Sequence, residues 1–287
     1  MSRTSVRGRG NPLRIAAAVA SLAVAGSLML TAPATATAQS KADATADATV
    51  TAAAPLPTVV LVHGAFADAS SWSAVIAQLQ RSRYPVIAVA NPMRGLEADA
   101  EHLRSVLSTI SGPVVLVGHS YGGAVITDAA TGDPDVKSLV YVAGYALQEG
   151  EHALEANELG GGHTDLGEHL VIRDYPGAAE GDGDVYVDPA HFGELIAADL
   201  PRTQRNVLAA VQRPVAYSAL LAPSGAPAWA SIPSWYLVSV DDEAIPVEAE
   251  RAMAERAGST TVEIRSSHAS MLSHPRQVVQ MIVDAAE

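Results

Sequence analysis

The stretch that decides the fold is Val114-Val115-Leu116-Val117-Gly118-His119-Ser120-Tyr121-Gly122-Gly123. Its four apolar residues predict a buried strand, the Ala-containing segment that follows predicts a helix, and the pattern G-x-S-x-G stands between them. So tight a turn strains the serine backbone, and glycines on either side avoid side chains that would clash. The pattern therefore predicts that the Ser120 hydroxyl stands clear of a sheet edge at a helix N-terminus, where developing negative charge is stabilised.

Short apolar runs alternate with helical patterns on both sides of this stretch, which is typical of βαβ units and a parallel sheet. The fold class is therefore α/β, with a mostly parallel central sheet of about six strands flanked by helices. The predicted strands cover residues 58–62, 86–89, 114–117, 138–142, 234–240 and 261–265. The predicted helices cover residues 71–81, 96–109, 122–131, 247–257 and 275–286.

The alternation breaks over residues 146–232. This segment holds the glycines 160–162, the acidic turn 180–184, and helical patterns near residues 189–199 and 201–210. An insertion of this size after the fourth strand predicts a cap over the carboxyl edge of the sheet.

The N-terminal residues predict a targeting segment. Four arginines precede the uncharged run 15–31, and Ala36-Thr37-Ala38 fits the small-x-small pattern of a signal peptidase site. We therefore expect residues 1–38 to be a secretory signal peptide and the protein to be secreted. The polar residues 39–55 predict a flexible leader, and residues 56–287 the folded domain.

Charge and composition exclude several kinds of partner. Removal of the four leader arginines changes the 18 basic residues to 14 against 31 acidic ones, a net charge of −17. So acidic a surface disfavours nucleic acid and anionic lipid, and we expect no stable membrane span after signal cleavage. The chain has no cysteine, so no disulfide framework is expected. No zinc or nucleotide motif occurs, and Asp182-Gly183-Asp184 lacks the later ligands of a calcium loop, so we expect no metal and no cofactor.

The first predicted strand ends in Val62-His63-Gly64-Ala65-Phe66. A backbone N–H at this strand end would lie beside the serine turn. We assign an oxyanion hole to the backbone N–H groups of Ala65 and Tyr121, the latter being the residue after the serine. His63 is interpreted as a structural histidine that bonds loop carbonyls.

The partners of a serine nucleophile on such a sheet follow it as an acid and then a histidine. His268 stands in a loop after the last strand, whereas its rival His274 lies in Ser273-His274-Pro275, which predicts a helix start. Asp242 is favoured as the acid because it lies on a turn after a strand. Asp241 and Glu243 are the alternatives.

With these residues in hand, the chain from about residue 57 to its C-terminus resembles the α/β-hydrolase superfamily, in the compact branch that contains plant methyl-ester esterases, hydroxynitrile lyases and bacterial carboxylesterases. The matching pieces are residues 62–65, Trp72, residues 118–123, residues 242–246 and residues 267–269. The lyases of that branch carry a lysine directly after the histidine and a threonine in the first loop. This chain has Ala269 and Ala65 there, which favours ester hydrolysis.

The resemblance implies a serine hydrolase with the triad Ser120, His268 and Asp242, acting on small or medium uncharged carboxylic esters through an acyl-enzyme. We expect Phe66, Asn91, Met93 and Phe192 to line the substrate pocket. A lactonase or amidase, a C–C lyase and a cofactor-free haloperoxidase would use the same triad and remain alternatives. A non-catalytic ligand-binding protein of this fold is a further one.

Overall fold

The structure, a computed structural model, describes residues 55–287. The predicted signal peptide 1–38 and the predicted leader up to residue 54 lie outside the described residues.

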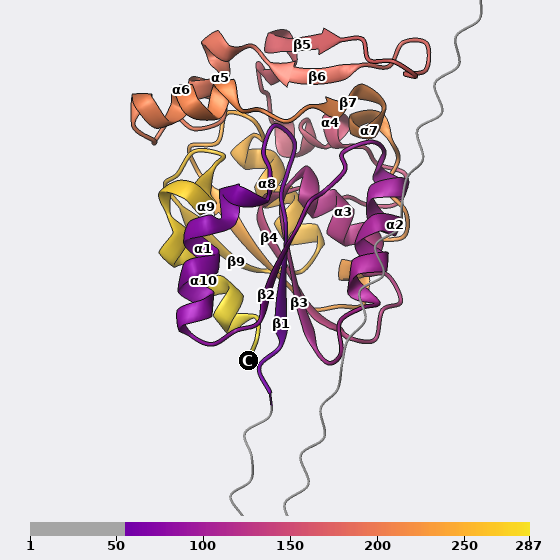
Figure 1. Cartoon of the computed structure of the whole chain (residues 1–287), viewed down its shortest axis with the longest axis vertical. Coiled ribbons are helices and arrows are strands. Elements are labelled where there is room, and N and C mark those ends of the chain that lie inside the picture. The colour runs from indigo at the N-terminus through magenta and orange to yellow at the C-terminus, as the bar shows by residue number, and fades with distance from the viewer. Residues whose placement is uncertain (1–54) are drawn as a thin grey trace, which may run out of the picture. The chain divides into compact units, whose positions relative to one another are not determined.

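Six parallel strands form the central sheet, in the order β2-β1-β3-β4-β8-β9 (Figure 1). Their bounds are β1 (Thr58–Val62), β2 (Val86–Val89), β3 (Val114–Ser120), β4 (Val136–Gly144), β8 (Ser234–Ser239) and β9 (Thr260–Ile264). The predicted fold class is confirmed. Since the chain turns from β1 to β2 on one side and returns to β3 on the other, the order reverses between β1 and β3. At such a reversal the carboxyl ends of the strands open a crevice for ligands.

Helices cover both faces of this sheet. Successive strand residues point to opposite faces, so a strand of consecutive apolar residues has apolar side chains to bury on each face. Val59 and Leu61 pack with one group of helices, and Val60 and Val62 with the other. The first group is α1 (Ser73–Arg81) with α9 (Ser270–Ser273) and α10 (Pro275–Asp284). The second group is α2 (Leu96–Leu107), α3 (Tyr121–Ala129) and α8 (Val247–Arg256). None of the helices within residues 55–287 has both the length and the hydrophobicity needed to cross a bilayer.

The segment between β4 and β8 forms the cap, which lies at the carboxyl ends of the strands, at the top of Figure 1. Besides helices it contains a small antiparallel sheet in the order β5-β6-β7, which the sequence analysis did not predict. The strands are β5 (Leu170–Arg173), β6 (Asp184–Val187) and β7 (Val215–Ala216). The α-helices are α4 (Ala153–Ala156), α5 (Pro189–Leu195), α6 (Arg202–Ala210) and α7 (Tyr217–Leu221).

Single turns of 3-10 helix complete the described chain. They are η1 (Ala69–Trp72), η2 (Leu159–Gly161), η3 (Leu166–His169) and η4 (Ala228–Ala230). The helix α10 begins at Pro275, as predicted, but His274 and not Ser273 is the residue at its N-cap.

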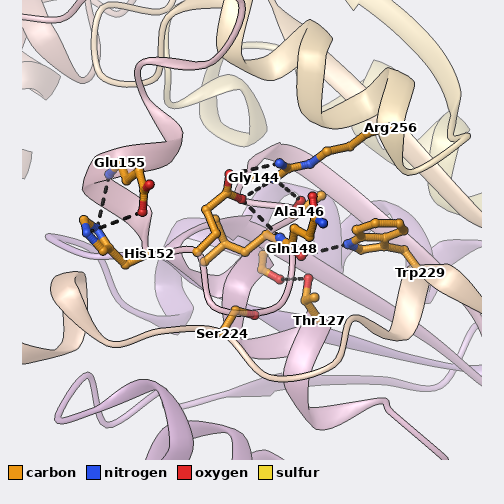
Figure 2. Close-up of polar contacts among 12 residues, drawn as sticks. Thr127, Gly144, Ala146, Gln148, His152, Glu155, Ser224, Trp229 and Arg256 are labelled. Carbon is orange, nitrogen blue, oxygen red and sulfur yellow. Dashed lines mark hydrogen bonds and ion pairs between the residues drawn. The ribbon is translucent and has the colours of Figure 1, made fainter.

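Polar contacts fix the start of the cap to the core (Figure 2). Arg256 of α8 donates from Nη2 to the carbonyl oxygen of Ala146 at 2.9 Å and from Nη1 to Glu151 at 2.9 Å. Within the cap, Trp229 donates from Nε1 to the carbonyl oxygen of Leu147 at 3.0 Å. The segment that leaves β4 is therefore held by side chains from far along the chain.

Candidate active site

Ser120 lies at the end of β3, where the chain turns into α3. Its backbone has φ 52° and ψ −126°, a strained conformation for a residue that carries a side chain. A Cβ on Gly122 would lie 2.4 Å from the carbonyl oxygen of Val62, so the turn fits only because this position is glycine. Ser120 stands at the N-cap of α3, yet its side chain makes no capping hydrogen bond. The hydroxyl therefore remains free to act in the cavity above the sheet.

His268 and Asp242 meet at the carboxyl ends of β8 and β9. The His268 Nδ1 lies 2.6 Å from Asp242 Oδ2, and both side chains are buried. The second carboxylate oxygen, Oδ1, accepts hydrogen bonds from the backbone N–H groups of Ala244 at 2.7 Å and Ile245 at 2.9 Å. A carboxylate fixed in this way keeps the proton of the imidazole on Nδ1 and leaves Nε2 as the acceptor, which is the tautomer a general base needs.

The rival residues of the sequence analysis lie elsewhere. Asp241 points outward and pairs with Arg265 at 3.3 Å on the surface. His274 Nδ1 contacts Ser273 Oγ at 2.8 Å and lies 3.6 Å from Asp199. Neither Asp241 nor His274 lines the cavities at Ser120.

Ser120 and His268 line the same cavity. The hydrogen bonds among residues 55–287 do not include one between the Ser120 hydroxyl and the His268 imidazole. In unliganded hydrolases such bonds are often long and tighten only when substrate binds.

The backbone donors assigned to the oxyanion hole border this cavity. Ala65 follows β1, Tyr121 opens α3, and both line the cavity with Ser120. A Cβ on Gly64 would lie 2.6 Å from the Ser120 Cβ, so glycine at this position lets the loop after β1 approach the serine closely. The Tyr121 phenol donates to Asp99 Oδ2 at 2.7 Å, and burial together with this carboxylate raises the pKa of Tyr121 above its usual value. Its side chain is thus occupied in the core, while its backbone lies beside the nucleophile.

Two of the four predicted pocket residues are placed differently. Asn91 is 1% exposed: its backbone N–H donates to His63 Nε2 at 3.1 Å and its side-chain amide donates to the His63 carbonyl oxygen at 3.2 Å. Met93 is fully buried in the core. Neither residue lines the cavities at Ser120, because the chain after β2 packs inward beneath the loop that follows β1. The prediction that they form the pocket wall was wrong.

His63 has the structural role that the sequence indicated. Its Nδ1 contacts the carbonyl oxygen of Gly64 at 2.9 Å, and its Nε2 accepts the Asn91 N–H. Burial lowers the pKa of His63, so the ring is neutral near pH 7. This pair ties the loop after β1 to the loop after β2.

His119, the residue before Ser120, has a role that the sequence analysis missed. Its Nε2 donates to the carbonyl oxygen of His268 at 3.0 Å, and the two ring centroids are 4.7 Å apart. The residue is 2% exposed, and burial lowers its pKa well below the usual value, so it stays neutral. It therefore holds the histidine loop without placing a second charge beside it.

The cap holds the same loop from the other side. The N–H of Ala269 donates to the carbonyl oxygen of Ile196 at 3.0 Å. Ser267 donates from its backbone N–H and from Oγ to the Asp199 carboxylate, at 3.2 and 2.5 Å. His268 thus stands between a core contact and two cap contacts, none of which follows from a local motif.

Glu250 of α8 is a second residue that no motif indicated. It is fully buried, and its Oε2 accepts the N–H of Ser239 at 3.1 Å. Burial, and then the charge of Asp242, raise the pKa of Glu250 well above its usual value. Its protonated form is therefore favoured at this position behind the carboxylate of Asp242.

Two cavities meet at the site, and we name them cavity 1 and cavity 2. Both are lined by Ala65, Phe66, Ile196 and His268. Cavity 1 extends past Phe192 and encloses about 100 Å³, whereas cavity 2 contains Ser120 and Tyr121 and encloses about 40 Å³. Phe66, which lines both cavities, has φ 62°, an uncommon value for a bulky residue. Phe66 and Phe192 both line cavity 1, and Phe66 also lines cavity 2.

Within the part of the chain that the structure describes, no group of three or more His, Asp or Glu side chains is placed to hold a metal ion.

The parallel sheet, the strained serine turn and the cap together define an α/β hydrolase. The sequence model of the alpha/beta hydrolase family matches residues 59–281, and the chain belongs to that family.

Relatives extend over most of the domain. The chain is 27% identical over 252 residues to the alpha/beta hydrolase nvfD of Aspergillus novofumigatus, with 80% of this chain and 96% of that protein covered. It is 25% identical over 268 residues to the pyrethroid hydrolase of Sphingobium wenxiniae, with 80% of this chain and 87% of that protein covered. The crystal structure of polyneuridine aldehyde esterase superposes with a TM-score of 0.69 at 23% identity, covering 81% of this chain and all of that one. The chain is thus similar to hydrolases, and the structural likeness shows the shared fold.

Proposed function

We propose that the protein is a serine carboxylesterase that cleaves small or medium uncharged esters. The observation that carries the proposal is the 2.6 Å contact between His268 and Asp242 beside a serine held in a strained strand-to-helix turn. The similarity to a pyrethroid hydrolase supports a small organic substrate.

The reaction follows from the roles of these groups. His268 Nε2 takes the proton of the Ser120 hydroxyl as Oγ attacks the ester carbonyl carbon, and the N–H groups of Ala65 and Tyr121 stabilise the oxyanion. The imidazolium then gives that proton to the leaving alcohol, and an acyl-serine remains. The imidazole then takes a proton from a water that attacks the acyl carbon, and the imidazolium returns this proton to Ser120 Oγ as the acyl–oxygen bond breaks and the acid is released. Asp242 orients the imidazole and stabilises its charged form.

Ala269 and Ala65 also support hydrolysis over cyanohydrin cleavage, because the lyases of the resembled branch carry lysine and threonine at these positions.

Purified protein and its Ser120→Ala variant should be compared with p-nitrophenyl acetate and p-nitrophenyl butyrate. We expect turnover by the parent and a loss of at least about a thousandfold in the variant. A fluorophosphonate should inactivate the parent and label Ser120. Equal rates for the two proteins, or a label on another residue, would contradict the proposal.

We also propose that the protein is exported, with cleavage after Ala38. N-terminal sequencing of protein recovered from the culture medium tests this. A mature chain in the medium that begins at Gln39 supports it, and a chain that stays in the cells with residues 1–38 attached refutes it.

A further inference from the structure

The two cavities have different relations to the reacting groups. Ser120 and Tyr121 line cavity 2 and do not line cavity 1. During catalysis the acyl group is bonded to Ser120 Oγ, with its carbonyl oxygen at the N–H of Tyr121. The acyl group of a bound ester therefore belongs in cavity 2.

His268 lines cavity 1, and Ser120 does not. Its wall includes Ala269, Met271 and Leu272, the residues after His268, and Leu208 from the cap. The leaving oxygen must face the imidazole that protonates it, so the alcohol group departs on the histidine side. His268 lines both cavities, and cavity 1 is the space on that side.

The cavity assigned to the alcohol group is larger than the cavity assigned to the acyl group. Cavity 2 encloses about 40 Å³, less than half of the volume of cavity 1. Cavity 1 encloses about 100 Å³, not far below the roughly 150 Å³ of an apolar cavity that holds benzene. Cavity 2 thus accepts a short acyl chain, and cavity 1 a group the size of a small ring.

The wall of cavity 1 is mostly apolar, with side chains such as Phe192, Leu208 and Met271. Its one carboxylate, Asp68, accepts the N–H of Ser70 at 2.7 Å, and the side chain of Ser70, with this backbone contact as a smaller cause, lowers the pKa of Asp68. An ionised carboxylate at this wall disfavours an anionic alcohol. The occupant that fits is an uncharged, apolar alcohol.

We propose that the preferred substrates are esters of short acids with bulky, apolar, uncharged alcohols, the acyl group lying in cavity 2 and the alcohol in cavity 1. This inference rests on the proposed esterase function.

One leucine in each cavity makes a matched test. Leu208 lines only cavity 1, Leu154 lines only cavity 2, and both are partly buried. Leu208→Trp and Leu154→Trp should each fill one cavity. The alcohol is varied with benzyl acetate against methyl acetate, and the acyl group with p-nitrophenyl butyrate against p-nitrophenyl acetate. kcat/KM is measured for the full folded protein, and the ratio within each pair is compared.

The parent should prefer benzyl over methyl acetate and p-nitrophenyl acetate over butyrate. Leu208→Trp should reduce the benzyl-to-methyl ratio about tenfold and leave the butyrate-to-acetate ratio unchanged. Leu154→Trp should reduce the butyrate-to-acetate ratio about tenfold and leave the benzyl-to-methyl ratio unchanged. If either tryptophan variant does not fold, Leu208→Ala and Leu154→Ala replace them and should raise the ratio of their own cavity alone.

The assignment would be overturned if the Leu208 variant changed the butyrate-to-acetate ratio and the Leu154 variant the benzyl-to-methyl ratio, or if each variant changed both ratios. In either case Ser120-dependent hydrolysis would still hold. A parent that hydrolyses none of these esters by a Ser120-dependent route would instead overturn the proposed function.

Discussion

At the scale of single residues, the contact between His119 and His268 connects the serine turn to the proposed base. In His119→Asn the shorter amide cannot reach the His268 carbonyl oxygen, whereas in His119→Gln the amide nitrogen stands near the position of Nε2. We expect His119→Asn to lower kcat about tenfold with little change in KM, because the base is misplaced after substrate has bound. His119→Gln should recover most of the rate.

Steady-state kinetics of both variants, with thermal melts to check folding, test this role. Equal loss in the two variants, or a rise in KM without a fall in kcat, would show that His119 serves packing only.

Glu250 makes folding stability depend on pH. Because its pKa is raised in the folded protein, the folded state binds a proton that the unfolded chain releases above about pH 4.3. The stabilisation from this proton is complete below that pH. As the pH rises, it falls by up to about 1.4 kcal/mol per unit until the folded-state pKa is reached.

Glu250→Gln carries no titrating proton at this position. Urea unfolding at several pH values between pH 5 and 8 should therefore show the parent losing stability relative to this variant as the pH rises. A difference between parent and variant that is constant over this range would indicate that Glu250 is charged in the folded protein.

At the scale of elements, the turn between β3 and α3 is limited by backbone contact. Gly122→Ala places a Cβ 2.4 Å from the Val62 carbonyl oxygen, so β1 or the start of α3 must shift. We expect a loss of about 1–3 kcal/mol in stability and of about a hundredfold in kcat, since a small displacement of a nucleophile is costly. Gly132→Ala is a useful control, because its Cβ meets no atom within 4 Å, although its φ of 79° strains any other residue.

Chemical denaturation separates the two effects. A Gly122→Ala protein with the kcat of the parent would show that the turn tolerates the shift.

The elements of the central sheet could be predicted because their strands are rich in Val, Ile and Leu, and β3 is buried along its whole length, although the edge strand β9 is mostly exposed. The small antiparallel sheet of the cap could not be predicted from the sequence. Its strands have two to four residues, and β7 is only Val215–Ala216, too short for an alternating pattern to appear. These strands pair through contacts between distant segments, such as Val185 with Val215, that no local signal marks.

The candidate site divides in the same way. Ser120, Ala65 and Tyr121 belong to motifs at strand ends, and Asp242 and His268 follow from the order of elements. His119, Asp199 and Glu250 act through long-range contacts or burial, and their roles depend on the folded structure. Asn91 and Met93 were assigned to the pocket because they follow a strand end. That position does not show whether a side chain points into the cavity or into the core.

At the scale of the whole domain, the cap and the core share the loop that carries His268. Asp199→Ala removes the acceptor for the N–H and hydroxyl of Ser267. We expect kcat to fall about tenfold and the loop to exchange amide hydrogens faster, since the cap then holds it through the Ile196 hydrogen bond and the apolar packing of Ala197 and Leu200 against Ala269. Hydrogen exchange with kinetics on one ester tests this, and a variant with unchanged kcat and exchange would show that the core alone holds the loop.

The cap contacts at Ile196 and Asp199 also constrain how such an enzyme can diversify. Mutations that reshape the substrate cavities through the segment around residue 196 also disturb the base, so gains in selectivity there carry a loss of turnover. The β5–β6 hairpin and the outer side of α6 have no such double role. Laboratory evolution, or exchange of caps between relatives, should therefore accept changes in those elements first and preserve the 196–199 segment as part of the catalytic apparatus.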